Sequence, residues 1–340
     1  MTAVPDAPTQ ADLDWSTIRD QAGAFVTTEY ASLDRTGSPV TWPVTPYLGE
    51  HTVDVSTGLT YPLKAERARR NPKVTLSFSL PRGSGLQSPG TFVVQGLATV
   101  RDADLRANSA RYLEVSNARF PQMYAAMPTA MLRGMAFYWS RIWIEVTPVR
   151  VLWWPNGDLD CAPQTWLPTT ALTAPPSDPA PAGRGAGSWK NTTPVDWNRR
   201  TRGALDRLGM PVLTTVTTDG WPLPLRVRDA EPTETGFRVR PPAGVDVLPG
   251  AASLTFHGHG EVFDSQENIG LVGGCHVNGD GSVEFEARRA LNDFIVPKNP
   301  LRRMIYLASA GRRLSKRLDA EAARRGQTVP RFADLGFSKG

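Results

Sequence analysis

A short stretch in the first quarter of the chain brings hydroxyl and basic side chains together. Ser56 and Thr57 stand at the end of an expected strand, and Lys64, Arg67 and Arg70 follow at three-residue steps. On a helix this spacing places the three cations on one side. Hydroxyl donors and clustered cations beside a helix start are suited to binding a phosphate group. The alternative is a solvated basic helix face that binds nothing.

The histidines are a second candidate for chemistry. His257 and His259 would point to the same face of a strand, with His276 near them, so a haem or metal site is conceivable. No nearby cysteine or carboxylate triad completes such a site, so histidines held by hydrogen bonds are the favoured interpretation. Cys275 is expected to be a small buried residue and not a nucleophile. We therefore assign no catalytic residue and no metal ligand from the sequence.

The hydrophobic pattern predicts that the phosphate motif lies in a first β-rich region, from about residue 23 to residue 154. Its alternating runs are rich in Val, Thr, Ile and aromatic residues, which is typical of half-buried strands. Between Asp102 and Trp139 apolar residues recur at three- and four-residue steps, which predicts helix. Core packing is the expected role of the four methionines on one face of that helix, Met123, Met127, Met131 and Met135.

A Pro/Ala/Gly-rich stretch separates the first β-rich region from a second. Residues 167–187 cannot form a core, so they are expected to be a linker or a long surface loop. The second β-rich region runs from about residue 205 to residue 294, and Asp219-Gly220 predicts a hairpin near its start.

The two β-rich regions resemble each other in the order of their strands and turns. The proposed matches are Thr27-Thr28 with Thr214-Thr215, Gly37-Ser38-Pro39 with Gly220-Trp221-Pro222, Leu76-Ser77-Phe78 with Leu254-Thr255-Phe256, and VVQGLATV with GLVGGCHV. The second copy lacks the long helical stretch and has the cation-free AGVDVLPG where the first has TYPLKAERARRNP. This pattern predicts a tandem β-barrel repeat with one elaborated copy and one reduced copy.

Composition excludes several classes of protein. A chain of 340 residues predicts about two domains. Cys161 and Cys275 cannot form a disulfide framework, and no C-x-x-C pair is present for a cysteine zinc site. No apolar run reaches the length of a membrane-spanning helix, and the first residues have no signal-peptide pattern. We expect a soluble, cytoplasmic protein.

The basic character of the chain is concentrated near its C-terminus. Eight basic and two acidic residues lie between 301 and 326. The net charge of this stretch, 8 − 2 = +6, exceeds the net charge of +5 of the whole chain. The apolar residues of this stretch recur at helical spacing: Leu301, Met304, Ile305, Ala308, Leu314, Leu318 and Ala322. We expect an amphipathic helix that packs on a barrel of its own chain or of a partner chain. It has no Trp or Phe to anchor it in a membrane, so neither membrane nor nucleic acid is expected as a partner.

The order of these motifs resembles the pyridoxamine-phosphate-oxidase-like split β-barrel family, which includes flavin- and deazaflavin-dependent oxidoreductases of actinobacteria. The resemblance rests on a hairpin with Gly-x-Pro in its turn, a strand ending in Thr, and the run from Lys64 through Asn71-Pro72-Lys73-Val74. VVQGLATV and the closing I-x-I-x-V-T-P-V-R-V-L-W-W are also similar. The resemblance covers residues 12–154 well and 205–294 faintly.

The resemblance implies a flavin in a groove between two barrels. Lys64 would bind the flavin phosphate, Ser56 and Thr57 would donate hydroxyl hydrogen bonds, and Arg67 or Arg70 would assist. The resemblance also implies that Pro43, Val44 and Thr45 lie along the isoalloxazine ring. Thr45 stands where the family usually has an aromatic residue. The second copy offers no cation at the Lys64 position. If the two copies pair within one chain, one cofactor site would remain.

Together these inferences predict a mainly β protein built from tandem split β-barrels, with a helical insertion in the first barrel and a basic C-terminal helix. The expected boundaries are 12–160 for the first barrel, 161–200 for the linker, 201–296 for the second barrel and 297–340 for the tail. The expected function is a flavin-dependent oxidoreductase with a small-molecule substrate, using FMN or, as the alternative, a deazaflavin coenzyme. The competing class is a non-catalytic protein that binds or senses a flavin or a haem. The pair of barrels could be formed within one chain or in a homodimer.

Overall fold

The structure is a computed structural model that describes residues 14–170, 172–183, 185, 197–261, 265–291 and 294–337. The first residues, where no signal peptide is expected, lie outside the described residues. Parts of the expected linker and the two outermost predicted domain boundaries, residues 12 and 340, also lie outside them. Within them, the protein is mainly β, with two curled antiparallel half-barrel sheets, as predicted.

The first sheet contains the strands of the first repeat, in the order β2-β1-β5-β6-β7-β4-β3, with β8 paired to β7. Their bounds are β1 Thr28–Leu33, β2 Pro39–Val44, β3 Pro46–Leu48, β4 Val53–Gly58, β5 Lys73–Phe78, β6 Thr91–Arg101, β7 Arg141–Trp154 and β8 Gln164–Trp166. Helices α1 (Trp15–Ala24) and α2 (Leu63–Arg70) belong to the same repeat.

The second sheet repeats the order of the first over seven strands and differs in where its eighth strand pairs. Its order is β10-β9-β13-β14-β15-β12-β11, with β16 paired to β14. The bounds are β9 Val212–Val216, β10 Pro222–Arg226, β11 Asp229–Pro232, β12 Gly236–Arg240, β13 Gly250–His259, β14 Gln266–Val277, β15 Val283–Ala290 and β16 Phe294–Val296. Two short helices precede it, α7 (Trp197–Thr201) and α8 (Ala204–Leu208). The tandem split-barrel architecture is therefore confirmed.

Strand register tests the proposed correspondence of the two copies. Leu76 pairs with Val94 in the first sheet as Leu254 pairs with Leu271 in the second, so LSF matches LTF and VVQGLATV matches GLVGGCHV. The Gly-x-Pro turns also match, because Pro39 and Pro222 each open the second strand of a hairpin.

One proposed match was wrong. Counting back from Leu33 and Val216, the partners of Pro39 and Pro222, sets Thr214 against Ala31 and not against Thr27 or Thr28. A Thr-Thr pair fits several positions of any β-strand, so composition alone could not define its register.

A β-bulge occurs at the same place in both copies. It lies between Gln95 and Gly96 in the first sheet and between Val272 and Gly273 in the second. A Cβ atom on Gly96 would lie 2.6 Å from the carbonyl oxygen of Thr147, and one on Gly273 would lie 1.8 Å from that of Glu286. Glycine is required at both bulges because the neighbouring backbone approaches so closely.

The two sheets pack against each other through their first hairpins. β2 contacts β13 and β14 of the second sheet, while β10 contacts β5 and β1 of the first. The Thr41 and Thr214 hydroxyls lie 2.6 Å apart, and Thr75 Oγ1 donates to the Pro222 carbonyl at 2.5 Å. Each hairpin stays paired within its own sheet and packs against the other sheet, with approximate twofold symmetry.

A buried charge cluster joins the barrels at this interface. Glu29 of β1 is fully buried, and its Oε1 accepts hydrogen bonds from Arg226 Nη2 at 2.7 Å, His257 Nε2 at 2.6 Å and Ser79 Oγ at 2.8 Å. Hydrogen bonds from these partners and their charges lower the pKa of Glu29 to about 2, against the effect of burial. We call these four residues the interface cluster.

The expected helical insertion lies between β6 and β7 and is divided into four helices. They are α3 (Leu105–Arg119), α4 (Pro121–Ala125), α5 (Thr129–Arg133) and α6 (Ala136–Trp139). Their inner faces form an aromatic cluster with Tyr47 of β3 and Trp143 of β7. The four methionines pack in or against this cluster, as expected.

Part of the segment expected to be a linker or a long surface loop is bonded to the first sheet. β8 extends the first sheet, and the chain after it bonds to the end of β6, where the Asp178 backbone N–H donates to the Val100 carbonyl at 2.9 Å. Thr99 Oγ1 donates to the Pro175 carbonyl at 2.7 Å, and the Asp178 carboxylate accepts from the Asp102 backbone at 2.8 Å. Proline-rich composition predicted the absence of a core in this segment, but a chain without a core of its own can still form hydrogen bonds with a neighbouring sheet.

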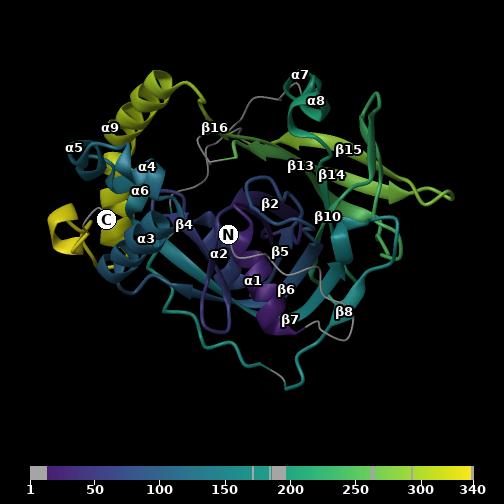
Figure 1. Ribbon diagram of the computed structural model, residues 1–340, viewed down its shortest axis with the longest axis horizontal. Coiled ribbons are helices and arrows are strands. Elements are labelled where there is room, and N and C mark those ends of the chain that lie inside the picture. The colour runs from purple at the N-terminus through teal and green to yellow at the C-terminus, as the bar shows by residue number, and fades with distance from the viewer. Residues whose placement is uncertain are drawn as a thin grey trace.

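The predicted C-terminal helix is α9 (Pro300–Arg324), followed by the short turn η3 (Phe332–Leu335). Leu318 and Ala322 of α9 enter the core of the first barrel, so the helix packs on its own chain, as expected. In Figure 1 α9 runs beside the short helices of the insertion, and it contacts α6. Of the helices that the structure describes, none has the length and hydropathy needed to cross a membrane.

Candidate functional site

Helix α2 has three sides with different roles. Ala65 and Ala68 face the first core and hold the helix in place. A second side is neutralised, because Arg69 pairs with Asp102 at 2.6 Å and Glu66 pairs with Arg324 of α9 at 2.5 Å. The third side carries the predicted cations Lys64, Arg67 and Arg70. α9 therefore fixes α2 from behind and leaves these cations facing away from it.

Lys64 is held as a half-buried cation. Its Nζ lies 5.5 Å from the centre of the Trp42 ring on β2. Burial, together with the positive charges of Arg67 and Arg141, lowers the pKa of Lys64 to about 8. Among the described residues, no carboxylate forms an ion pair with Lys64. An amino group in this setting favours an anion that can neutralise it.

Arg141 is a member of the site that the sequence analysis missed. It is the first residue of β7 and pairs with Gly58, the last residue of β4. Its guanidinium lies 4.2 Å from the centre of the Tyr112 ring, and Nη2 donates to Tyr112 Oη at 3.0 Å. Its Nε is buried with no hydrogen-bond partner within the described chain. Only the pairing of β4 with β7, more than eighty residues apart in the sequence, reveals this position.

Two hydroxyl groups beside Arg141 also lack partners. Thr60 Oγ1 and Ser140 Oγ are buried and form no hydrogen bond with any described residue. A Cβ atom on Gly58 would be 3.7 Å from both Thr60 Oγ1 and Arg141 Nη1, so these two groups flank the same glycine. We refer to Lys64, Arg67 and Arg141 as the cation cluster. Hydrogen-bond donors without a partner and positive charge converge at this cluster.

The other predicted site residues are distributed around the cluster. Ser56 lies on the same face of β4 as Gly58, because alternate residues of a strand share a face. Thr57 lies on the opposite face, and its hydroxyl donates to the Tyr61 carbonyl at 2.9 Å. Arg70 is exposed and donates to the Leu33 carbonyl at 3.3 Å.

The three residues expected along the flavin ring occupy different environments. Pro43 is buried in β2 opposite Glu29, whereas Val44 packs against the first core. Thr45 is half-buried between β2 and β3. The structure thus gathers the basic residues of the motif, while these three do not share one surface.

The second barrel also contributes positive charge. Arg289 of β15 is close enough to Arg67 to act on its pKa, which burial lowers and Asp34 raises. Arg289 corresponds to Arg150 of the first copy, because they pair with Val272 and Gln95 at the same bulge. The positive charge therefore comes from both barrels.

The matching place in the other half of the molecule is closed. Lys73 Nζ donates to the Asp219 carbonyl at 2.5 Å, and Arg150 pairs with Asp219 at 3.3 Å. A Cβ atom on Gly220 would be 3.8 Å from Lys73 Nζ, whereas one on Gly37 would meet nothing within 4 Å. The reduced copy has no helix between β12 and β13, so it presents no counterpart of α2.

His257 and Cys275 are not suited to catalysis. His257 belongs to the interface cluster, where it forms a hydrogen bond with Glu29 across the two barrels. Burial lowers the pKa of His257, which favours its neutral form. Burial raises the pKa of Cys275, which does not suit a nucleophile. Within the described residues there is no group of three or more side chains that could hold a metal ion.

Lys64 predicts a change of stability with pH. The pKa of Lys64 is about 8 in the folded protein, against an ordinary value of 10.5 that applies to the unfolded chain. Between these pH values the folded chain therefore binds fewer protons than the unfolded chain. The free energy of unfolding should then rise with pH across this window. Lys64→Met should stabilise the ligand-free protein at neutral pH by roughly 1–3 kcal/mol and remove that rise. Urea unfolding at several pH values measures both effects, with the exposed Lys316→Met as the control. A loss of stability at neutral pH would contradict the assignment.

Comparisons with known proteins return structures and not sequences. No family model matches the chain, and no curated protein matches it. Among solved structures it is similar to a putative pyridoxamine 5'-phosphate oxidase from Listeria innocua, with 15% identity and a TM-score of 0.28, over 40% of this chain and 94% of that one. A conserved hypothetical protein from Mycobacterium tuberculosis matches with 16% identity and a TM-score of 0.34, over 51% and 98%.

A third similar structure is described as an F420 reductase. It has 16% identity and a TM-score of 0.29, over 39% of this chain and 94% of that one. The two half-barrel sheets fit a split barrel, which is the fold that the sequence resemblance implied. At these scores and identities the matches carry no information about cofactor or activity.

Proposed function

We propose that the protein is a flavin-dependent oxidoreductase that binds the phosphate of FMN at the cation cluster. The observation that supports this most is the convergence of Lys64 and Arg141 without an ion pair to any described carboxylate. Uncompensated, partly buried charges are unfavourable in the absence of a partner. A phosphate supplies that partner, and its three oxygens can accept several hydrogen bonds at once.

The residues present fit a phosphate group. Lys64 would neutralise one charge, and Arg141 Nε with the buried Thr60 and Ser140 hydroxyls would donate hydrogen bonds. Arg67 and, from the second barrel, Arg289 would add electrostatic attraction. When bound, the flavin supplies the hydride and electron transfer, while the protein binds and orients it. A deazaflavin coenzyme also carries a phosphate and remains the alternative occupant.

Removing the Lys64 amino group tests the proposal directly. Lys64→Ala should weaken FMN binding by about 1.5–3 kcal/mol, the usual contribution of a hydrogen bond to a charged partner. Fluorescence titration measures the affinity, and circular dichroism checks that the fold is intact. The exposed Lys316→Ala is the matched control and should bind as the wild type does. Equal affinity of Lys64→Ala and wild type would contradict the phosphate assignment.

The same titration gives the stoichiometry. Because the reduced copy lacks α2, we expect one cofactor per chain. Riboflavin, which lacks the phosphate, should bind about equally to wild type and Lys64→Ala. Saturation at two FMN molecules per chain would contradict the single-site proposal, and tight binding of a deazaflavin without FMN would identify the alternative.

A further inference from the structure

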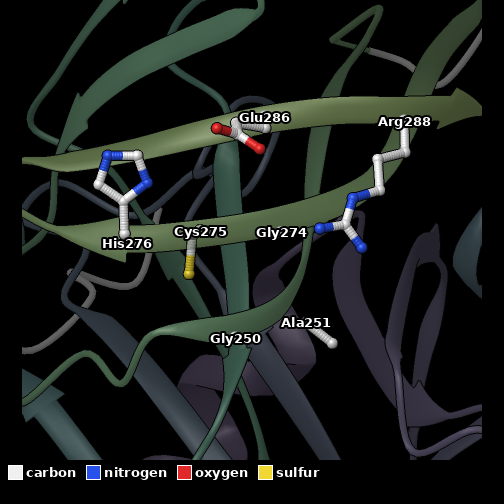
Figure 2. Close-up of a pocket in the computed structure, with 7 residues that line it drawn as sticks. All are labelled: Gly250, Ala251, Gly274, Cys275, His276, Glu286 and Arg288. Carbon is white, nitrogen blue, oxygen red and sulfur yellow. The ribbon is translucent and has the colours of Figure 1, made fainter.

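The second barrel contains a cavity of about 310 Å³ outside the cation cluster. It is lined by Gly250 and Ala251 of β13, Gly274, Cys275 and His276 of β14, and Glu286 and Arg288 of β15. Figure 2 shows Glu286 and Arg288 on one strand above the cavity and His276 on the neighbouring strand. Its volume is at the lower end of the range for small-molecule sites.

Comparison with the first copy shows how the cavity arises. The strand registers set Gly250, Ala251 and Gly274 against Pro72, Lys73 and Leu97. All three positions carry smaller residues in the second copy, and they are neighbours in the sheet.

The residues around this space change in a coordinated way. His276, Glu286 and Arg288 correspond to Thr99, Thr147 and Val149. Three uncharged side chains are thus replaced by ionisable ones around a space that three smaller residues open.

The cavity is also accessible where the first copy is covered. In the first copy Thr99 is bonded to the segment that follows β8, through the Pro175 carbonyl. In the second copy the corresponding His276 is exposed, as are Glu286 and Arg288. Loss of the covering segment together with the smaller residues leaves a solvent-accessible site.

The two charged side chains of the cavity, Glu286 and Arg288, have no ion-pair partner among the described residues. Glu286 and Arg288 are two residues apart on β15, so they lie about 6–7 Å apart along one face of the strand. No ion pair joins them to each other or to any other described residue. The neighbouring Glu284, by contrast, pairs with Arg238 at 2.5 Å. A free cation and a free anion on one face can hold a ligand that carries both charges.

We propose that this cavity binds a small zwitterion with an α-amino acid head group. Arg288 binds the ligand carboxylate, Glu286 binds its ammonium group, and His276 lies at the rim as a further polar contact. Simple anions are disfavoured because Glu286 repels them, and simple amines because Arg288 does. Gly274 gives the ligand room, since it leaves the cavity floor without a side chain. This site is independent of the proposed flavin function.

Calorimetric titration with individual L-amino acids at millimolar concentration tests the proposal. We expect at least one of them to bind, and its analogues without the amino group or without the carboxyl group to bind much more weakly. Glu286→Gln and Arg288→Ala should each weaken binding by roughly tenfold or more. Arg302→Ala, which removes an exposed arginine of α9, should leave it unchanged. Binding that is equal for an amino acid and its deaminated analogue would overturn the zwitterion assignment.

A substitution that restores the first-copy residue provides a second test. Gly274→Leu should fill the cavity and abolish binding, because Leu97 occupies this position in the first copy. The new Cβ would lie 3.2 Å from Arg288 Nη2, the far end of a flexible side chain that can move, so the fold should be retained. The Lys64→Ala protein should bind the amino acid as the wild type does, which separates this site from the flavin proposal. Failure of every L-amino acid to bind the wild type, or unchanged binding by Gly274→Leu, would overturn the proposal.

Discussion

Arg226→Ala is expected to destabilise the protein by about 3–5 kcal/mol, because it leaves the Glu29 carboxylate buried without its main cation. The Glu29 side chain is fully buried and Arg226 is nearly so, and the pair spans the two barrels. His257 and Ser79 would still donate to Glu29, but neither replaces the positive charge. Urea unfolding followed by tryptophan fluorescence measures the loss.

Two further variants define this prediction. Arg150→Ala removes another inter-barrel ion pair, to Asp219, which is half-exposed, and should cost no more than about 1 kcal/mol. The double variant Glu29→Leu/Arg226→Leu should recover much of the loss, since an apolar pair leaves no unpaired buried charge. If Arg226→Ala were as mild as Arg150→Ala, the interface cluster would not hold the barrels together.

The same cluster predicts sensitivity to acid. The folded pKa of Glu29, about 2, is below its ordinary value of 4.5, so its contribution to stability is complete above 4.5. This contribution is lost as the pH falls from there towards 2. The loss in this range should be smaller in the Glu29→Leu/Arg226→Leu variant.

Removal of residues 297–340 is expected to produce the largest loss of stability. The truncation deletes Leu314 and Leu318, whose burial alone is worth about 4–8 kcal/mol by the usual effect of removing buried leucines. It also deletes Arg325, which pairs with Asp102 at 2.9 Å where both side chains are 2% exposed. A fall in melting temperature that is independent of salt, or failure to fold, is the expected result.

A point substitution keeps this prediction testable if the truncated chain does not fold. Leu318→Ala should cost about 2–5 kcal/mol, whereas Ile305→Ala, at an exposed position of the same helix, should cost less than about 0.5 kcal/mol. If truncation left stability intact but abolished a steeply salt-dependent binding to DNA, α9 would be a nucleic-acid-binding helix.

Loss of α9 should also reach the cation cluster. Glu66 and Asp102 anchor α2 through Arg324, Arg325 and Arg69. An α2 without these contacts would no longer hold Lys64 beside Arg141. We therefore expect Leu318→Ala to weaken FMN binding less than Lys64→Ala does, since it loosens the support without removing a donor.

The sequence by itself determined the features that depend on neighbouring residues. The strand pattern, the repeat, the helix α9 and the spacing of Lys64, Arg67 and Arg70 are all local, because strand and helix periods relate residues only a few positions apart. The matched turns at Pro39 and Pro222 belong to the same class. Local signals of this kind appear directly in the order of the residues.

The tertiary structure decided which distant residues meet. Arg141 joins Lys64 only through the pairing of β4 with β7, and Glu29 meets Arg226 only where β1 and β10 of the two barrels pack against each other. The cavity beside Arg288 depends on three strands of the second sheet. Such contacts follow from strand register and sheet packing, where a shift of one residue turns every side chain to the opposite face. A single sequence contains no local pattern that encodes that register.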